Sequence, residues 1–448
     1  MTQCNSQLSF GFLGGKEVVG SFSGGDLSSD GGVMLLREAD QRLGLTAALA
    51  RRLRDPRDPD KIWHGLDEML AQRIYQIACG YEDCNDADDL RFDPLFKTAV
   101  GRCPQSGRDL ASQPTLSRFE NLVTRTQLRR LAEVFVELFL ARYRGRGAQR
   151  IILDFDSTDD ETHGQQQFAQ FHGFYDEYCY LPLLVTATVD GGPEELLVAM
   201  LRPGRSHAAA QALGVLRRLV ARLREAFPQA QVLLRADSGF ALPEIYDWCE
   251  QEPGLDYLIS LAQNARLRAL AEPHLEDARA AYEETGERIQ HFREEWYAAK
   301  SWAQERRVVI KAEVSAEGNN PRFVVTSLSA GQAQDLYEEY GQRGEMENRI
   351  KELKDDLKMD RTSCHRFEAN QFRVFLHAAA FVLCAELRRQ LQGTVLAEAQ
   401  VSSLQRWLFK LGVRVRETVR RIWLEFASAC PLQELWPLLL ARLRAAPT

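Results

Sequence analysis

The chain has 448 residues, 45% of them hydrophobic and 27% charged, which is the composition of an ordinary folded protein with about two to four domains. The formal net charge of -7 excludes a globally basic nucleic-acid-binding protein, so any contact with nucleic acid must depend on local basic patches. The nine cysteines contain no C-x-x-C pair, which argues against a disulfide framework or a zinc knuckle.

The N-terminal stretch MTQCNSQLSF has neither the basic nor the apolar segment of a signal peptide, and no apolar run of about 18 residues follows it. We therefore expect a cytoplasmic protein with no membrane partner. Up to about residue 35 the chain is rich in Gly and Ser, and alternation around Val18 to Phe22 predicts a strand or an ordered arm. Helical patterns then continue, and we predict a mainly helical N-terminal domain, residues 1–148.

One segment of this domain, SQPTLSRFENL, has the start signal of a helix, with Ser112 as N-cap and Pro114 in the first turn. Helix-turn-helix modules place such segments in the major groove of DNA, where Gln113 and Arg118 are suitable readers of bases, and on this interpretation residues 1–148 bind DNA. A polar helix start without any DNA contact explains the same residues equally well. The basic residues that follow could track phosphates: Arg129, Arg130, Arg142, Arg144, Arg146 and Arg150.

From residue 149 strands alternate with helices. Three strands come first, then a helix, a strand, a helix and a strand, which is the order of a ribonuclease-H-like mixed sheet whose closing helix is delayed. Residues 264–326 separate the fifth strand from this closing helix, and their pattern predicts an inserted, mainly β module. We therefore predict an α/β catalytic domain in two parts, 149–263 and 327–392, followed by a C-terminal helical region, 393–448. The strands before the insertion are expected at Arg150 to Asp156, Tyr178 to Val189, Glu195 to Leu201, Gln231 to Ala236 and Asp256 to Leu261.

The stretch from Tyr340 to Asp360 contains no Gly or Pro after Gly344 and predicts a helix. At about 100° per residue, four of its polar side chains fall on one narrow stripe: Tyr340, Arg343, Glu347 and Lys354. An apolar stripe lies beside it, so the polar stripe is expected at the edge of a core, where it can serve a phosphate and a metal together. For an isolated helix, a solvated face with ion pairs explains these residues better; the rest of the chain changes that balance.

Three acidic residues stand at informative places in this scheme. Asp156 ends the first predicted strand and Asp237 follows the fourth, and these strand ends are adjacent in the predicted sheet, where Glu347 can cross over them. Two divalent ions about 4 Å apart need several carboxylate oxygens and can activate a hydroxyl for attack on a phosphodiester. Each acid alone is weak evidence, since a strand-end Asp usually serves a turn or a cap.

Together these residues resemble a known family. The spacing of Tyr340, Arg343, Glu347 and Lys354 matches the Y-R-E-K signature of the DDE cut-and-paste transposases of bacterial insertion sequences. The segments IILDFDST, LLRADSGF, HGFYDEYCYLPLL, LRPGR and QPTLSRFEN are similar to insertion-sequence family thirteen-eighty, in the transposase DDE domain group 1. The resemblance covers nearly the whole chain.

The resemblance implies a role for each matched residue. It places the catalytic and metal-binding DDE triad on three acids: Asp156, Asp237 and Glu347. It implies two Mg2+ ions, for which Mn2+ can substitute. Arg343 and Lys354 match positions that hold the phosphate near the cleaved transposon end, and Tyr340 matches one that packs against or bonds to it.

Two assignments stay open at this point. Asp154 and Asp156 alternate onto the same face of one strand, so either could reach a metal. We choose Asp156 because the acid, Ser and Thr158 match the family's first motif, and we keep Asp154 in reserve. Trp296 and Trp302 lie in the insertion, where related enzymes stack an aromatic ring on a flipped base during hairpin formation; tryptophans of the surface or core are the alternative.

A basic cluster in the C-terminal region is typical either of a DNA-backbone surface or of an ordinary basic helix. Its members are Arg406, Lys410, Arg414, Arg416, Arg420 and Arg421.

The resemblance implies a transposase that binds the terminal inverted repeats of its element and target DNA, both double-stranded. It implies metal-dependent hydrolysis of one strand, strand transfer by the freed 3′-hydroxyl and a hairpin intermediate. We expect a homodimer on paired ends, since two coupled cuts need two active sites, in a bacterial cytoplasm and associated with the nucleoid. The alternatives are another ribonuclease-H-like nuclease and an inactive derivative that only binds DNA; the intact acids count against the latter.

Overall fold

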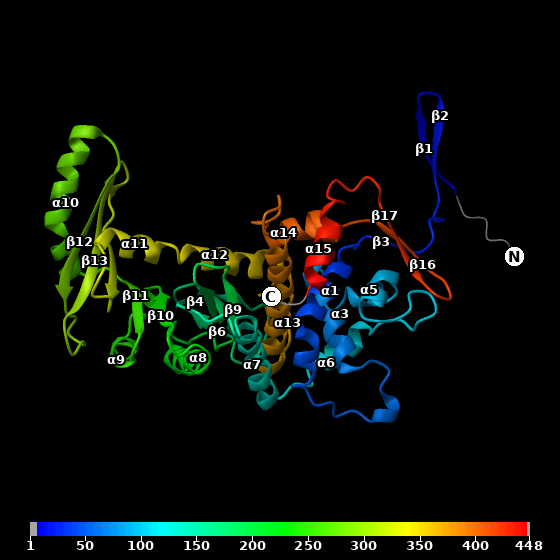
Figure 1. Ribbon diagram of the computed structural model, residues 1–448, viewed down its shortest axis with the longest axis horizontal. Coiled ribbons are helices and arrows are strands. Elements are labelled where there is room, and N and C mark those ends of the chain that lie inside the picture. Colours follow the sequence, from blue (N-terminus) through cyan, green and yellow to red (C-terminus); the bar gives the residue numbers. More distant parts are fainter. Residues whose placement is uncertain (1–6, 446–448) are drawn as a thin grey trace. The chain divides into compact units, whose positions relative to one another are not determined.

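The computed structural model describes residues 7–445, which form two compact units (Figure 1). One unit combines the chain up to residue 122 with the chain from residue 379 onward, and the other contains residues 123–378. Cys4 lies outside the described residues.

The first unit is mainly helical and is built around α3 (Leu66–Ala78), whose side chains from Met69 to Ala78 are all buried. Gly65 precedes this helix. Acidic residues occupy its first turn, where their negative charge interacts favourably with the positive end of the helix dipole. The other helices of this unit are α1 (Val33–Leu43), α2 (Leu45–Ala50), α4 (Ala87–Leu90), α5 (Pro94–Ala99), α6 (Gln113–Glu120), α14 (Val401–Leu404) and α15 (Leu435–Arg444), with the 3-10 turn η1 (Pro59–Lys61) and the π-helical turn η4 (Gln405–Phe409). The helix α13 (Phe367–Gln390) begins in the second unit and ends in this one.

A buried ion pair crosses this helical unit. The Arg73 guanidinium on α3 lies 3.1 Å from the Glu120 carboxylate at the end of α6, and both side chains are almost completely buried. Arg73 also donates to the carbonyl oxygen of Glu82 at 2.9 Å. The pair therefore ties α3, α6 and the connection before α4 together inside the core.

The C-terminal region differs from the predicted helical region. It contains an antiparallel hairpin, β16 (Val413–Glu417) and β17 (Ile422–Phe426), and β16 pairs with β3 (Leu27–Ser28). The physical reason is the two-residue alternation of apolar and charged side chains. Val413 and Val415 are buried while Arg414 between them is exposed, as in a strand with one covered face. The interpretation of this basic cluster as a basic helix is therefore wrong for residues 413–426. A second hairpin, β1 (Leu8–Leu13) with β2 (Lys16–Gly20), confirms the strand predicted near Val18.

The second unit is organised around a nine-stranded mixed sheet. Its order is β12-β13-β15-β11-β10-β4-β8-β9, with β14 paired to β13. β4 is parallel to β10, β10 is parallel to β11, and the other neighbours in this order are antiparallel. The strands are β4 (Arg150–Ser157), β8 (Leu183–Val189), β9 (Glu195–Met200), β10 (Gln231–Ala236), β11 (Leu255–Leu261), β12 (Ile289–Tyr297), β13 (Arg306–Ser315), β14 (Gly318–Asn319) and β15 (Arg322–Thr326).

Helices cover both faces of this sheet. One face packs against α7 (Arg125–Arg142), α8 (Ala212–Ala226), α9 (Pro243–Gln251) and α10 (Ala265–Thr285) in a continuous apolar core. The other face, with Leu233 and Leu258, packs against Leu336 of α11 (Ala333–Gly341). Figure 1 shows α10 beside β12 and β13. The predicted α/β class with a mixed sheet is confirmed.

Two predicted segments differ in detail. Tyr178 to Val189 was expected as one strand, but β7 (Glu177–Tyr180) ends before Pro182, which has no N–H for a strand ladder, and β8 begins after it. β7 pairs instead with β5 (Asp160–Glu161) and β6 (Gln170–His172) in a small sheet. The β strands of residues 264–326, predicted as an inserted, mainly β module, extend the main sheet, because β15 pairs directly with β11.

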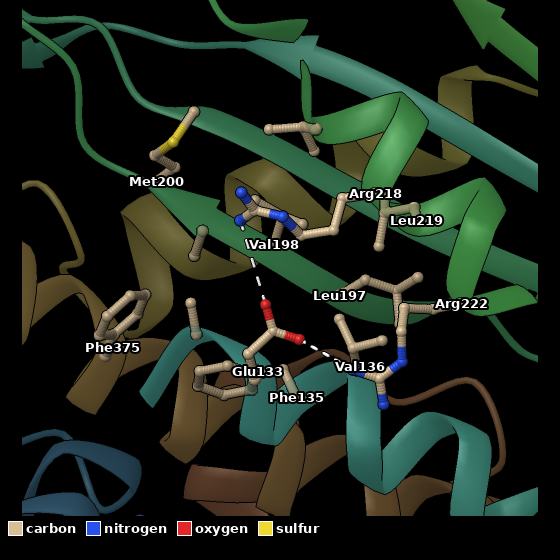
Figure 2. A pocket seen from close by; sticks show the side chains of 13 residues that line it. Glu133, Phe135, Val136, Leu197, Val198, Met200, Arg218, Leu219, Arg222 and Phe375 are labelled. Carbon is tan, nitrogen blue, oxygen red and sulfur yellow. Dashed lines mark hydrogen bonds and ion pairs between the residues drawn. The ribbon is translucent and has the colours of Figure 1, made fainter. Parts of the chain in front are cut away.

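An apolar cavity of about 100 Å³ lies where α7, β9 and α8 meet (Figure 2). Glu133 lies at its edge and pairs with Arg222 at 3.0 Å and with Arg218 at 4.0 Å. The cavity is lined by none of the residues predicted for the site, so we treat it as a packing feature of this edge of the sheet.

We predict that Glu120→Gln lowers the free energy of unfolding by about 3–5 kcal/mol, because it leaves the Arg73 guanidinium buried without a counter-charge. Chemical denaturation followed by circular dichroism measures the change. The matched control is Glu38→Gln, which breaks a pair with the exposed Arg444 and should cost less than about 1 kcal/mol. An equal loss of unfolding free energy in both variants would contradict the view that burial makes the Arg73–Glu120 pair more sensitive to loss of one partner.

Glu313 on β13 predicts a pH-dependent stability. Burial raises the pKa of Glu313. Hydrogen bonds from Gln290, Arg288, Lys311 and Asn320 lower this pKa by more than burial raises it, and the net value falls from 4.5 to about 2. Because the folded pKa is lower, this contribution to stability is complete above pH 4.5 and is lost as the pH falls toward 2. Denaturation of wild type and Glu313→Gln at several pH values should show a steeper acid loss for wild type; parallel curves would refute this.

Candidate active site

Two of the three predicted acids are brought together by adjacent parallel strands. Asp156 is near the end of β4, and Asp237 directly follows β10, where its carboxylate accepts the backbone N–H of Gly239 at 2.9 Å and caps the 3-10 turn η2 (Ser238–Phe240). In the strand register, Ala236 lies opposite Phe155, so the next residue on each strand is one of the two acids. Parallel strands end at the same edge, and this edge therefore carries both carboxylates.

Asp156 has a shifted pKa. Its side chain is buried and accepts the backbone N–H of Ser157 at 2.8 Å and a guanidinium N–H of Arg343 at 2.7 Å. Burial raises the pKa of Asp156, Arg343 lowers it, and the negative charge of Asp237 raises it again, with a net value of about 6. The edge thus concentrates more negative charge than one guanidinium neutralises.

Arg343 connects this edge to the third acid. It lies in the turn between α11 and α12 (Gly344–Lys351), and its second terminal nitrogen donates to Glu347 on α12 at 2.9 Å. Burial lowers the pKa of Arg343, but Asp156 and Tyr340 raise it, and the net pKa lies above the ordinary value. Tyr340 lies in the last turn of α11 and packs at the edge of the core, 6.2 Å from the ring of Tyr337.

The helix predicted over residues 340–360 is interrupted. A turn separates α11 from α12 at Gln342 and Arg343, and the last part is a π-helical segment, η3 (Glu352–Asp356). Gly341 and Gly344 flank this turn and lower helix propensity there. Lys354 in η3 lies 2.9 Å from Asp159 and 3.3 Å from the hydroxyl of Thr158. Arg343 therefore attaches this helical segment to the end of β4, and Lys354 attaches it to the chain just beyond that strand.

The structure separates the roles of Asp154 and Asp156. Asp154 is fully buried and binds Arg235 of β10 through two hydrogen bonds of 2.7 and 2.6 Å. Burial raises the pKa of Asp154, and Arg235 counters part of this rise. Arg235 in turn donates to the carbonyl oxygen of Glu339 in α11 at 2.8 Å. Asp154 thus has a full partner set within the sheet and its covering helix, whereas Asp156 faces the second acid.

Sequence reasoning missed three residues beside the carboxylates. Asp159 binds Lys354, and the run of acids after strand β4 was the signal that could have found it. Arg202 is buried and donates to the hydroxyl of Ser157 and the carbonyl oxygen of Leu181, both at 2.8 Å. Burial raises the pKa of Tyr175 to about 12, with further contributions from Asp159, Asp156 and Asp237. Tyr175 and Arg202 lie in the segments HGFYDEYCYLPLL and LRPGR.

Other predicted residues have partners of their own. Gln113 and Arg118 belong to the other compact unit, on α6, where the Gln113 N–H donates to Asp88 at 2.9 Å and Arg118 donates to Thr115 at 3.3 Å. Trp296 on β12 is 65% exposed. Trp302, in contrast, packs edge-on against Tyr246 and Tyr297 and is partly buried against the core.

The three acids have the chemistry of a divalent-cation site. Carboxylate oxygens are the ligands that Mg2+ and Mn2+ prefer, and the repulsion between Asp156 and Asp237 is what a bound cation relieves. Within residues 7–445, no three His, Cys, Asp or Glu side chains already converge on one point as metal ligands. In this structure Arg343 instead joins Asp156 to Glu347.

The fold and the site define a mixed α/β protein with a carboxylate-centred site at one edge of its sheet. The model of the family described as transposase DDE domain group 1 matches residues 10–448, and the chain belongs to this family. It is thus a transposase by family, with DNA as the substrate and divalent metal ions in general use among its relatives. No match was found among curated proteins. Within residues 7–445, every helix is too short or too polar to cross a lipid bilayer.

We predict that Asp154→Asn lowers the free energy of unfolding by about 3–5 kcal/mol, because it removes the counter-charge of the buried Arg235. The matched variant Asp156→Asn should leave stability unchanged or higher at pH 7, because the fold raises the pKa of Asp156 and so disfavours its charged form. Chemical denaturation of both variants tests this difference. A larger loss of unfolding free energy for Asp156→Asn than for Asp154→Asn would show that Asp156, and not Asp154, is the acid that stabilises the fold.

Proposed function

We propose that the chain is a cut-and-paste transposase of insertion-sequence family thirteen-eighty. It would bind the terminal inverted repeats of its element, cut them by metal-dependent hydrolysis and join the freed 3′-hydroxyls to target DNA. The observation that carries this proposal is the meeting of Asp156 and Asp237 at adjacent strand ends, with Arg343 linking Asp156 to Glu347.

The strand arrangement supports a ribonuclease-H-like catalytic domain. The five strands β11-β10-β4-β8-β9 hold two parallel and two antiparallel neighbour pairs, with the first strand of the domain, β4, in the centre. This is the order expected from the sequence pattern, and it brings the two strand-end acids to one edge. Apart from the helical character of residues 393–448, the domain limits predicted above remain part of this proposal, as does a DNA-reading role for Gln113 and Arg118.

The residues of the site divide the work. Asp156, Asp237 and Glu347 would hold two Mg2+ ions, which supply activation of the attacking oxygen and stabilisation of the leaving oxygen. Arg343 and Lys354 would bind the phosphate and offset the charge that develops on it, since guanidinium and ammonium groups pair strongly with phosphate oxygens. Arg202 holds the Ser157 hydroxyl and so keeps the end of β4 in position.

Two further features belong to the same proposal. The exposed ring of Trp296 is available to stack on a flipped base during a hairpin step, whereas the packed ring of Trp302 is not. The protein would act as a homodimer on paired ends, because the element has two ends to cut.

The test uses a labelled duplex that carries the inverted repeats flanking the gene, incubated with Mg2+ or with chelator. We expect cutting at the repeat tips and joining only with Mg2+. Glu347→Gln should lower the cleavage rate by about 10³-fold, which corresponds to several kcal/mol of lost transition-state stabilisation, while end binding stays within about 3-fold.

The matched control is Glu345→Gln on the same helix, which loses an equal charge from an exposed side chain and should cut normally. Normal cutting by Glu347→Gln would remove Glu347 from the site. Tight binding of the repeats by wild type without any cutting would indicate an inactive DNA-binding derivative instead.

A further inference from the structure

The hairpin of β16 and β17, residues 413–426, is here named the basic hairpin (Figure 1). In its register Val415 lies opposite Leu424 and Arg416 lies opposite Trp423. Opposite residues of antiparallel strands share a face, so the first pair turns toward the core and the second turns outward. Val415 is buried and Trp423 is 43% exposed, in agreement with this division.

Strand β16 of the basic hairpin is held to its unit at Val415 and at Glu417, the last residue before the turn. The Val415 N–H donates to the carbonyl oxygen of Asp26 at 2.8 Å, next to the pairing of β16 with β3. The Glu417 carboxylate accepts the backbone N–H groups of Gln105 and Ser106 at 2.9 and 3.0 Å. These hydrogen bonds, with that from the Ser106 hydroxyl, lower the pKa of Glu417. The hairpin is therefore fixed up to Glu417, directly before the tip.

The tip, in contrast, extends into solvent. Thr418 and Arg421 close it, with the Thr418 N–H donating to the Arg421 carbonyl oxygen at 2.8 Å and the Arg421 N–H donating to the Thr418 hydroxyl at 3.1 Å. Val419 and Arg420 stand between them, and Val419 is fully exposed. Among residues 7–445, the side chains of Arg420 and Arg421 have no acidic partner.

The outer face combines positive charge with an aromatic ring. The guanidinium carbons of Arg416 and Arg421 lie 5.9 and 5.5 Å from the centroid of the Trp423 ring. Glu425 on this face is already paired with Arg416 at 3.3 Å. Arg414, Arg420 and Arg421 thus leave a local positive surface on a chain whose net charge is -7.

We propose that the basic hairpin binds the phosphate backbone of duplex DNA, with Arg420 and Arg421 at its tip as the principal contacts. Unpaired guanidinium groups match phosphate oxygens in charge and geometry, and a two-stranded ribbon is narrow enough to lie against a duplex. Trp423 holds the guanidinium groups of Arg416 and Arg421 on the outer face through its ring. The contact is independent of base sequence, because phosphates carry no sequence information. This inference rests on the proposed function, which supplies DNA as the substrate.

The test measures fluorescence anisotropy of the full-length protein with two labelled duplexes of equal length, one carrying the inverted repeat and one of random sequence. Chelator is present, so no cutting occurs, and salt is varied. Arg420→Gln with Arg421→Gln should bind both duplexes about 10- to 100-fold more weakly at 0.1 M salt. The slope of log affinity against log salt should shrink by roughly two, at about 0.9 per lost phosphate contact.

Two matched variants make the result specific. Arg217→Gln with Arg218→Gln removes an equal charge from exposed positions of α8, where Arg217 also lies over a tryptophan, 5.6 Å from the Trp248 ring, and it should keep wild-type binding. Arg420→Lys with Arg421→Lys should recover most of the affinity, since the charge returns. Circular dichroism checks that all variants fold.

An unchanged affinity and salt slope in the Arg420 and Arg421 double variant would overturn the inference while leaving the proposed function intact. So would an equal loss in the α8 control, because the effect would then be one of net charge alone. A wild-type protein that binds neither duplex would instead overturn the proposed function itself.

Discussion

The ion pairs of Arg343 with Asp156 and Glu347 are the constraint on which the arrangement of the site depends. The sheet forces this constraint, because β4 and β10 are parallel neighbours and bring Asp156 and Asp237 to one buried edge. Burial and mutual repulsion raise the pKa of Asp156, so a positive group is required there. Arg343 meets this requirement and fixes the turn between α11 and α12 to the end of β4.

The long segment between the second and third acids helps to build this geometry. Residues 264–326 add β12, β13, β14 and β15 to the same sheet, and β15 returns beside β11. The chain then leaves the sheet and enters α11, whose Leu336 and Tyr337 cover the apolar part of one face. Because this face is covered up to Tyr340, the next turn places Arg343 over the carboxylates.

The sequence predicts the individual strands and the class of the fold, but not which side chains pair across neighbouring elements. The apolar runs RIILDFD and QVLLRAD identify two buried strands that end in acids, and the mixed α/β class follows from the alternation of elements. Alternation also shows that Asp154 and Asp156 share a face, but not that Arg235 on the neighbouring strand neutralises Asp154, because strand register is a tertiary property. The contact of Lys354 with Asp159 was missed for the same reason. In VRVRE, residues 413–417, the alternation of apolar and charged residues indicates a strand, whereas the density of basic residues is also typical of a basic helix.

The two aspartates of β4 show how one strand separates a structural acid from an acid of the site. Asp154 is paired with Arg235, and that pair is fixed by the register of β4 and β10, so it cannot open unless the sheet opens. Asp156 is paired with Arg343, which stands in a turn between two helices and can change partner without breaking any strand pairing. On the proposed function, a DNA phosphate that attracts Arg343 would free the Asp156 carboxylate for a cation. Substrate binding and metal binding would then favour each other, because both use the same two charges.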